Sequence, residues 1–169
     1  SFTPMISARS FRTTELVKEL CHQGHDVTLL TYLEPEHEEL MAEWGFSIIP
    51  LGKRPKDFNL KNISGIEFLF KRVIRRILLY FFQIPEIKIM FHVKRSLKRL
   101  KDFDIMISVA TPHPTHWGTA LARKKSGDVA KIWLADCGDP FMMAKYDNLG
   151  KPFYLSFFEK LWGKRADFI

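Results

Sequence analysis

The chain has 169 residues, of which 46% are apolar, 14% aromatic and 27% charged. This is the composition of one globular domain, and it excludes an intrinsically disordered chain. Lys and Arg number 26 against 19 Asp and Glu, a formal net charge of +7, which predicts attraction to an anionic partner such as nucleic acid, acidic lipid or a phosphorylated ligand.

The N-terminal part of the chain alternates between helical and strand patterns. Residues 1–7 are expected to be a loop that follows a first strand, which the sequence lacks or contains only in part. Apolar residues at helical spacing then predict a helix over residues 8–22, ended by Gly24. A strand is predicted over residues 27–31, a short acidic helix over 36–44 ended by Gly45, and a third strand over 46–51. This alternation favours a parallel sheet with right-handed crossovers.

The middle of the chain is strongly basic. Residues 53–61 lack periodicity and are predicted to be a mobile loop, while helices are predicted over 66–82 and 87–100, separated by Pro85. The first helix carries apolar residues on one side. Cations on its other side exclude a membrane-spanning segment, because each costs about 2.5–3.5 kcal/mol at the bilayer centre. The cations of the two helices are Lys71, Arg72, Arg75, Arg76, Lys94, Arg95, Lys98 and Arg99.

A basic amphipathic helix of this kind is typical of binding to a membrane surface. The alternative is a solvated face whose cations are favoured near helix ends. Both interpretations stay open on the charge pattern alone.

The C-terminal part contains a strand, loop and helix around which we expect the chain to be organised. Residues 105–109 predict a buried strand, Pro112 and Pro114 a loop, and the residues from 115 a helix that ends at Gly127. A strand over 131–135, a polar loop over 145–151 and a helix over 153–165 follow. Since ligands bind beyond the carboxyl ends of parallel strands, the loop 111–116 is the first candidate site.

Two cysteines, Cys21 and Cys137, lie far apart and lack metal-ligand spacing. They predict neither a disulfide framework nor a zinc site, and they suit a reducing cytosol.

At the C-terminal end of the sequence, an apolar run begins within residues 166–169. We therefore expect a fragment of a longer protein.

Several segments carry a resemblance to one enzyme family. They are SARSFR at 7–12, GHDVTLLT at 24–31, DIMIS at 104–108 with Pro112, His116 and ALA at 120–122, IWLADCGDPF at 132–141, FEK at 158–160 and KRADFI at 164–169. In this order they resemble the N-terminal domain of retaining, family 4 glycosyltransferases of the two-lobed GT-B type. Gly138 and Phe141 stand where that family usually has Arg and Trp, and Ser7-Ala8-Arg9 replaces its glycine pair.

The resemblance implies an α/β, Rossmann-like, three-layer domain over residues 1–169, with a mostly parallel sheet, as the acceptor-side half of a GT-B enzyme. The C-terminal lobe that binds the nucleotide-sugar donor is then absent, and this half alone is expected to be inactive. The whole enzyme would transfer a hexose to a glycan acceptor, lipid-linked in our interpretation, in surface polysaccharide biosynthesis. It would need no other cofactor, and it would lie in the cytoplasm at the inner face of the cell membrane.

Two residues are predicted to be catalytic. His116 resembles the family's histidine that hydrogen-bonds a hydroxyl of the transferred sugar, and the alternative is a histidine that caps a helix. Asp139, favoured over Asp136, would steer a hydroxyl, although Asp before Pro is also an ordinary turn former. His113 is close enough to pair with His116 on a metal, but Pro114 and the lack of nearby carboxylates argue against one. The predicted substrate-binding residues are Ser7, Arg9, Ser10, Arg12, Thr111, His113 and Asp136.

Two other functions compete with this interpretation. A Rossmann domain of an oxidoreductase would carry a G-x-G-x-x-G after a strand, and the sequence has none. A nucleic-acid-binding domain would interleave aromatic residues with its cations. Here the aromatic residues fall on the apolar sides of helices, so no nucleic acid is expected as a partner.

Overall fold

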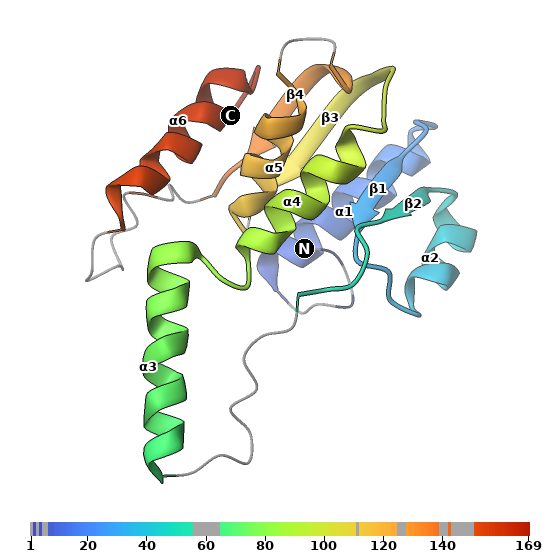
Figure 1. Ribbon diagram of the computed structural model, residues 1–169. Coiled ribbons are helices and arrows are strands. Elements are labelled where there is room, and N and C mark those ends of the chain that lie inside the picture. The colour runs from blue at the N-terminus through green and yellow to red at the C-terminus, as the bar shows by residue number, and fades with distance from the viewer. Residues whose placement is uncertain are drawn as a thin grey trace.

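The computed structural model describes residues 2, 4, 7–55, 65–110, 112–124, 128–138, 142 and 151–169. Helices and short parallel strands alternate along the chain, so the protein belongs to the α/β class (Figure 1). The predicted loop at 53–61 lies largely outside the described residues, as do Gly127, residues 145–150, Thr111 and Asp139.

The N-terminal half forms one parallel unit, as the sequence predicts. Ser7 caps its first helix, because its side-chain oxygen accepts a hydrogen bond of 3.0 Å from Ser10 N. Gly45, in the left-handed conformation at φ 78°, ends the second helix. The two strands pair in parallel from Thr28 opposite Ser47 to Thr31 opposite Pro50. The elements are α1 (Ala8–His22), β1 (Thr28–Thr31), α2 (His37–Trp44) and β2 (Ser47–Pro50).

The C-terminal half repeats this arrangement with longer strands. β3 (Phe103–Val109) and β4 (Ala130–Asp136) pair in parallel, and α5 (Pro114–Ala122) connects them. Beyond α5 and β4, a short 3-10 turn, η1 (Phe153–Leu155), leads into α6 (Ser156–Arg165). After α6 the chain returns to the outer edge of β4, where Phe168 forms a parallel bridge with Leu134.

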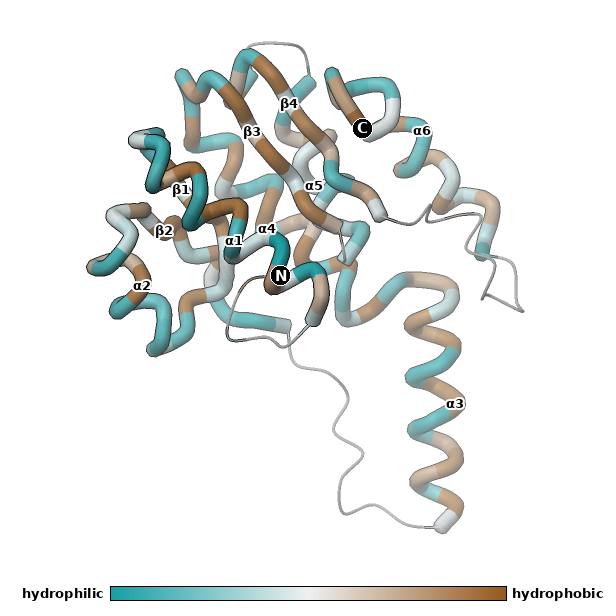
Figure 2. Tube along the Cα trace, turned by 180° about the vertical axis from the view of Figure 1, so that it is seen from behind, coloured by the Kyte–Doolittle hydropathy of each residue, from teal (hydrophilic) through white to brown (hydrophobic). Residues whose placement is uncertain are grey.

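One continuous sheet was expected, and the described residues form two separate sheets of two strands each. All the pairings are parallel, as predicted. In Figures 1 and 2 the strands follow one another across the molecule as β2, β1, β3 and β4. Helices α4 (Ile87–Leu97) and α5 lie on one face of these strands and α1 lies on the other.

The carboxyl ends of the strands point to the same side of the molecule. Arg12, near the start of α1, reaches Asp136 at the end of β4. Arg54, shortly after β2, reaches Glu34, shortly after β1. We call this side the carboxyl rim: the loop that begins α1 together with the residues that follow β1, β2, β3 and β4.

The main core lies between α4, α5, β4 and α6. Trp117 and Trp133 are fully buried there, and the ring of Trp117 stacks on Phe158 with centroids 4.8 Å apart. Gly118 lets α4 and α5 pack closely, because a Cβ at this position would lie 2.5 Å from the carbonyl oxygen of Met90. The remaining members of this cluster are Met90, Ala120, Ala135, Leu155 and Trp162.

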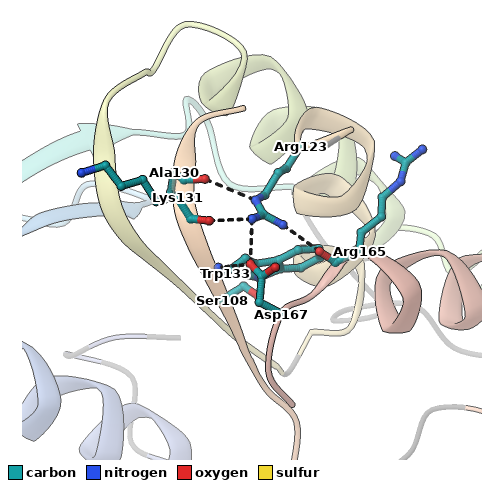
Figure 3. A network of polar contacts seen from close by, with 7 residues as sticks. All are labelled: Ser108, Arg123, Ala130, Lys131, Trp133, Arg165 and Asp167. Atoms are coloured by element: carbon teal, nitrogen blue, oxygen red, sulfur yellow. Dashed lines mark hydrogen bonds and ion pairs between the residues drawn. The ribbon is translucent and has the colours of Figure 1, made fainter. Parts of the chain in front are cut away.

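Helix α5 is shorter than predicted. It ends at Ala122, and Arg123 leaves the helical conformation with φ −87° and ψ 97°. Its side chain turns into the protein, where it is 2% exposed and forms an ion pair of 2.7 Å with Asp167 (Figure 3). It also donates hydrogen bonds to the carbonyls of Ala130, Lys131 and Arg165. Arg123 therefore ties α5, β4 and the end of α6 together, which the local sequence pattern does not indicate.

Helix α3 (Gly65–Phe82) stands apart from this core. Both views show it projecting away from the strands and the other helices. None of its described residues is buried. Helix α4 follows it closely along the chain but ends at Leu97, earlier than the predicted residue 100.

Candidate functional site

Two segments that are far apart in the sequence meet at the carboxyl rim. Arg12 Nη2 lies 2.5 Å from Asp136 Oδ2. The guanidinium of Arg9 lies 3.6 Å from the position that a Cβ would occupy on Gly138. The loop that begins α1 is therefore brought against the end of β4, as the sequence predicts for a site beyond the carboxyl ends of the strands.

The Arg12–Asp136 pair is open to solvent, with side-chain exposures of 54% and 33%. A guanidinium offers a planar fork of donors that matches phosphate or carboxylate oxygens. An ionised carboxylate accepts hydrogen bonds from hydroxyl groups. The pair could therefore hold a ligand that carries both an anionic group and hydroxyls.

A second polar group at the carboxyl rim was not predicted. Arg54 Nη2 lies 2.8 Å from Glu34 Oε1, and its guanidinium lies 5.6 Å from the ring centre of Tyr32. The hydroxyl of Tyr32 is 3.1 Å from His92 Nδ1. Burial raises the pKa of Tyr32, and the Arg54 charge opposes this effect. The positions of Tyr32 and Arg54 in the sequence could have indicated this group, because each of them follows a predicted strand.

An apolar cavity of about 580 Å³ opens between β1 and β3. Side chains of β1, β3 and α4 form its walls, and polar residues of the carboxyl rim border one end of it. These border residues are Ser7, Tyr32, Arg54 and Thr115.

His116 does not face this cavity or the solvent, which corrects the prediction that it would meet a substrate. It is 0% exposed and lies against Trp162, with ring centroids 4.9 Å apart. A hydrogen bond of 2.8 Å joins its Nδ1 to Ser108 Oγ, and Trp133 Nε1 donates another of 2.8 Å to the same oxygen. In this structure His116 connects β3, α5 and β4 within the core.

The environment of His116 keeps its ring neutral. Burial and the nearby charge of His113 lower the pKa of His116 from 6.5 to about 4, although the backbone of Asp136 acts in the opposite direction. No described residue forms a hydrogen bond with its Nε2. A cation at this position would lack a counter-charge, so His116 is a neutral core residue at physiological pH.

The other predicted site residues lie in different environments. Ser10, predicted to bind substrate, is 2% exposed, and its backbone N–H donates to Ser7 Oγ in the α1 cap. His113 occupies the N-cap position of α5 and is partly buried. Ser7, Arg9, Arg12 and Asp136 lie at the carboxyl rim. Thr111 and Asp139 lie outside the described residues.

Within the described part of the chain, no group of three or more His, Cys, Asp or Glu side chains could hold a metal ion. Cys21 and Cys137 are not joined by a disulfide.

The predicted basic surface is divided in two. Lys71, Arg72, Arg75 and Arg76 lie together on the projecting helix α3, whereas Lys94 and Arg95 lie near the far end of α4. Lys98 and Arg99 follow the end of α4. Among the described residues, no helix combines the length and the apolar character needed to cross a bilayer.

No protein-family model, curated protein or solved structure matches this chain.

Proposed function

We propose that this chain is the acceptor-side domain of a GT-B-like glycosyltransferase that works at a membrane surface. The enzyme would transfer a hexose, with retention, from a nucleotide-sugar donor to a lipid-linked glycan during surface polysaccharide biosynthesis. The observation that carries the proposal is the Arg12–Asp136 contact. It brings together two of the segments that resemble the family, SARSFR at 7–12 and IWLADCGDPF at 132–141.

The residues of the carboxyl rim are suited to binding the acceptor rather than to catalysing the transfer of the sugar. Arg9 and Arg12 are placed to hold phosphate oxygens, and Asp136 to accept hydrogen bonds from sugar hydroxyls. Since His116 is buried, the proposal gives it a structural role and assigns it no contact with the sugar. The nucleotide-sugar would bind to a partner lobe beyond this domain.

Helix α3 supports a membrane location. Its residues Ile66, Leu69, Phe70, Val73, Ile77 and Phe81 follow helical spacing, and each is exposed, from 45% at Phe81 to 86% at Ile66. We call this set the α3 stripe. A stripe of large apolar side chains left in water is unfavourable unless a partner covers it. In Figure 2 apolar and polar residues alternate along α3 as the helix turns.

The partner that fits the α3 stripe is an anionic bilayer. Lys71, Arg72, Arg75 and Arg76 lie on the opposite and flanking sides of the helix. A helix of this kind lies in the plane of the interface, with its apolar side in the acyl boundary and its cations near lipid phosphates. Each nearby cation contributes about 1 kcal/mol of attraction to an anionic surface.

The apolar surface continues beyond α3. The hydroxyl of Tyr154 donates a hydrogen bond to the carbonyl of Phe81, so η1 lies beside the end of α3. Phe153 and Phe157, at 84% and 60% exposure, therefore add aromatic surface next to the α3 stripe. Aromatic side chains at the depth of the lipid headgroups are typical of proteins at a membrane interface.

The acceptor role is tested by calorimetric binding of a short-chain, water-soluble lipid diphosphate disaccharide. The same lipid diphosphate without the sugar, and a dinucleotide cofactor, serve as controls. We expect the disaccharide to bind more tightly than the bare lipid diphosphate, because the sugar adds hydroxyl groups that can donate hydrogen bonds to Asp136. Tight binding of the dinucleotide instead, with no preference for the sugar, would support an oxidoreductase domain and contradict the proposal.

A further inference from the structure

The cavity between the two sheets is bounded by two strand edges. In the described part of the chain, β1 pairs only with β2 and β3 pairs only with β4. The cavity of about 580 Å³ extends along both facing edges, since residues 28–32 line one side and residues 105–109 the other. Leu97 and Leu100 border it at one end and Pro112 at the other, so it runs the full length of β3.

The facing edge of β1 carries backbone groups that β2 does not use. In a parallel pair, successive residues direct their N–H and C=O groups to opposite sides of the strand. The hydrogen bond of 2.9 Å from Leu51 N to Thr31 O shows that Thr31 faces β2. By this alternation the backbone groups of Thr28 and Leu30 are directed toward the cavity.

The facing edge of β3 has the same property. The hydrogen bond of 3.0 Å from Ala110 N to Asp136 O shows that Ala110, just beyond the end of β3, faces β4. By alternation Ser108 and Met106 also face β4, so the backbone groups of Ile105 and Ile107 are directed toward the cavity. Two rows of donors and acceptors therefore face one another across apolar walls.

A small apolar ligand does not suit these walls. A volume of about 580 Å³ is within the usual range for a small-molecule site, so volume alone does not decide the occupant. An apolar molecule would bury both rows of backbone groups without hydrogen-bond partners, which is unfavourable. An extended polypeptide strand would satisfy both rows at once.

We infer that this cavity holds an additional parallel strand, an apolar segment of the same polypeptide joined to the chain ahead of Phe2. Phe2 lines the cavity and is 3% exposed, and α1 begins a few residues later. A strand here, followed by α1 and then β1, makes a parallel crossover unit of the usual right-handed form. It joins the two sheets into one, in the order β2, β1, inserted strand, β3, β4. The inference does not depend on the proposed function.

The inference is tested with two N-terminal extensions of the chain, each as long as β3, which has 7 residues. One is Lys-Lys-Ile-Val-Leu-Val-Val, which forms strands, and the other is Lys-Lys-Gly-Ser-Gly-Ser-Gly, which carries the same charge. Amide hydrogen exchange of each version is followed by NMR. Binding of anilinonaphthalene sulfonate, whose emission rises in apolar cavities, is measured in parallel.

The strand-forming extension is expected to slow exchange at the amides of Thr28, Leu30, Ile105 and Ile107 by at least roughly tenfold. It should also reduce the dye emission, while the Gly/Ser extension changes neither. Equal effects of the two extensions, or unchanged exchange at these amides with unchanged emission, would overturn the inference. Protection that sedimentation shows to occur only in an oligomer would also overturn it.

Discussion

Arg12 and Asp136 are 124 residues apart in the sequence, yet their side chains form an ion pair of 2.5 Å at the carboxyl rim. The pair joins the first helix to the end of the last described strand. Because both side chains are partly exposed, the pair contributes little to stability. Its significance is the placement of a cation and an anion where ligands of α/β domains bind.

Gly118 is expected to be required for the close packing of α4 and α5. In Gly118→Ala the new Cβ would lie 2.5 Å from Met90 O and 2.9 Å from Val93 Cβ, so a backbone must move. We expect a loss of about 1–3 kcal/mol in the free energy of unfolding, measured by urea denaturation.

Gly163→Ala is the matched control, because Gly163 lies within α6 and a Cβ there meets no atom within 4 Å. That variant should be unchanged or more stable by up to about 1 kcal/mol. Equal stability of the two variants would show that α4 and α5 are not in this close contact.

Arg123 is expected to be the most important charged residue for stability. Arg123→Leu removes the partner of Asp167 and three further hydrogen bonds, to the carbonyls of Ala130, Lys131 and Arg165. We expect the free energy of unfolding to fall by about 3 kcal/mol. This is the lower end of the range for breaking a buried ion pair, because the side chain of Asp167 is 34% exposed.

Lys131→Ala provides the comparison in the same denaturation series. It breaks the Lys131–Asp104 pair, whose side chains are 75% and 80% exposed. No measurable change in stability is expected. A loss for Lys131→Ala as large as that for Arg123→Leu would contradict the distinction between the two pairs.

His116 is expected to make stability depend on pH. Its pKa is lowered from 6.5 to about 4 in the folded protein, so the unfolded chain binds a proton more readily. The contribution of neutral His116 to the free energy of unfolding is fully present above about pH 6.5, and it is lost as the pH falls to about 4. The full loss is about 3 kcal/mol, from about 1.4 kcal/mol for each pH unit.

The check is urea denaturation between these pH values, with His116→Asn as the comparison. Asparagine does not titrate, and its amide can replace Nδ1 in the contact with Ser108. The variant should therefore lose less stability than the parent chain on acidification. Parallel pH profiles would mean that folding does not lower the pKa of His116.

Much of the secondary structure could be predicted from local patterns. The bounds of α1 are as predicted, because Ser7 provides the N-cap and apolar residues recur at helical spacing up to His22. The strands were placed to within two residues, since each is a short apolar run bounded by polar or turn residues.

The errors concern residues whose partners are distant in the sequence. Arg123 falls within the helix predicted from residue 115, and only Asp167, 44 residues later, explains why its side chain is buried beyond the end of α5. His116 lies shortly after a proline loop and looks exposed, but Ser108 and Trp133 hold it in the core. The separation into two sheets was also missed, because periodicity indicates strands but not which strands pair.

The α3 stripe is expected to drive attachment to anionic vesicles. Val73→Asp places a charge in the middle of the stripe, where Val73 is 55% exposed. We expect co-sedimentation with vesicles of mixed anionic and neutral phospholipid to fall at least roughly tenfold. Purely neutral vesicles should bind the parent chain weakly, since the cations then have no partner.

Phe91→Asp is the matched control, because Phe91 is 56% exposed on α4, outside the stripe. It should leave vesicle binding unchanged. Equal loss in both variants would indicate a general effect of charge. Equal binding of the parent chain to neutral and anionic vesicles would remove the electrostatic part of the proposal.

The central claim is that the carboxyl rim receives a lipid-linked sugar while α3 rests on the membrane. The most direct test is binding of the chain to anionic vesicles with and without a lipid diphosphate disaccharide, for the parent chain and Arg12→Gln. The proposal predicts that the disaccharide strengthens binding of the parent chain, and that Arg12→Gln loses this gain while keeping its stability and its binding to plain anionic vesicles. A disaccharide that leaves binding of the parent chain unchanged, or strengthens binding of both proteins equally, would contradict it.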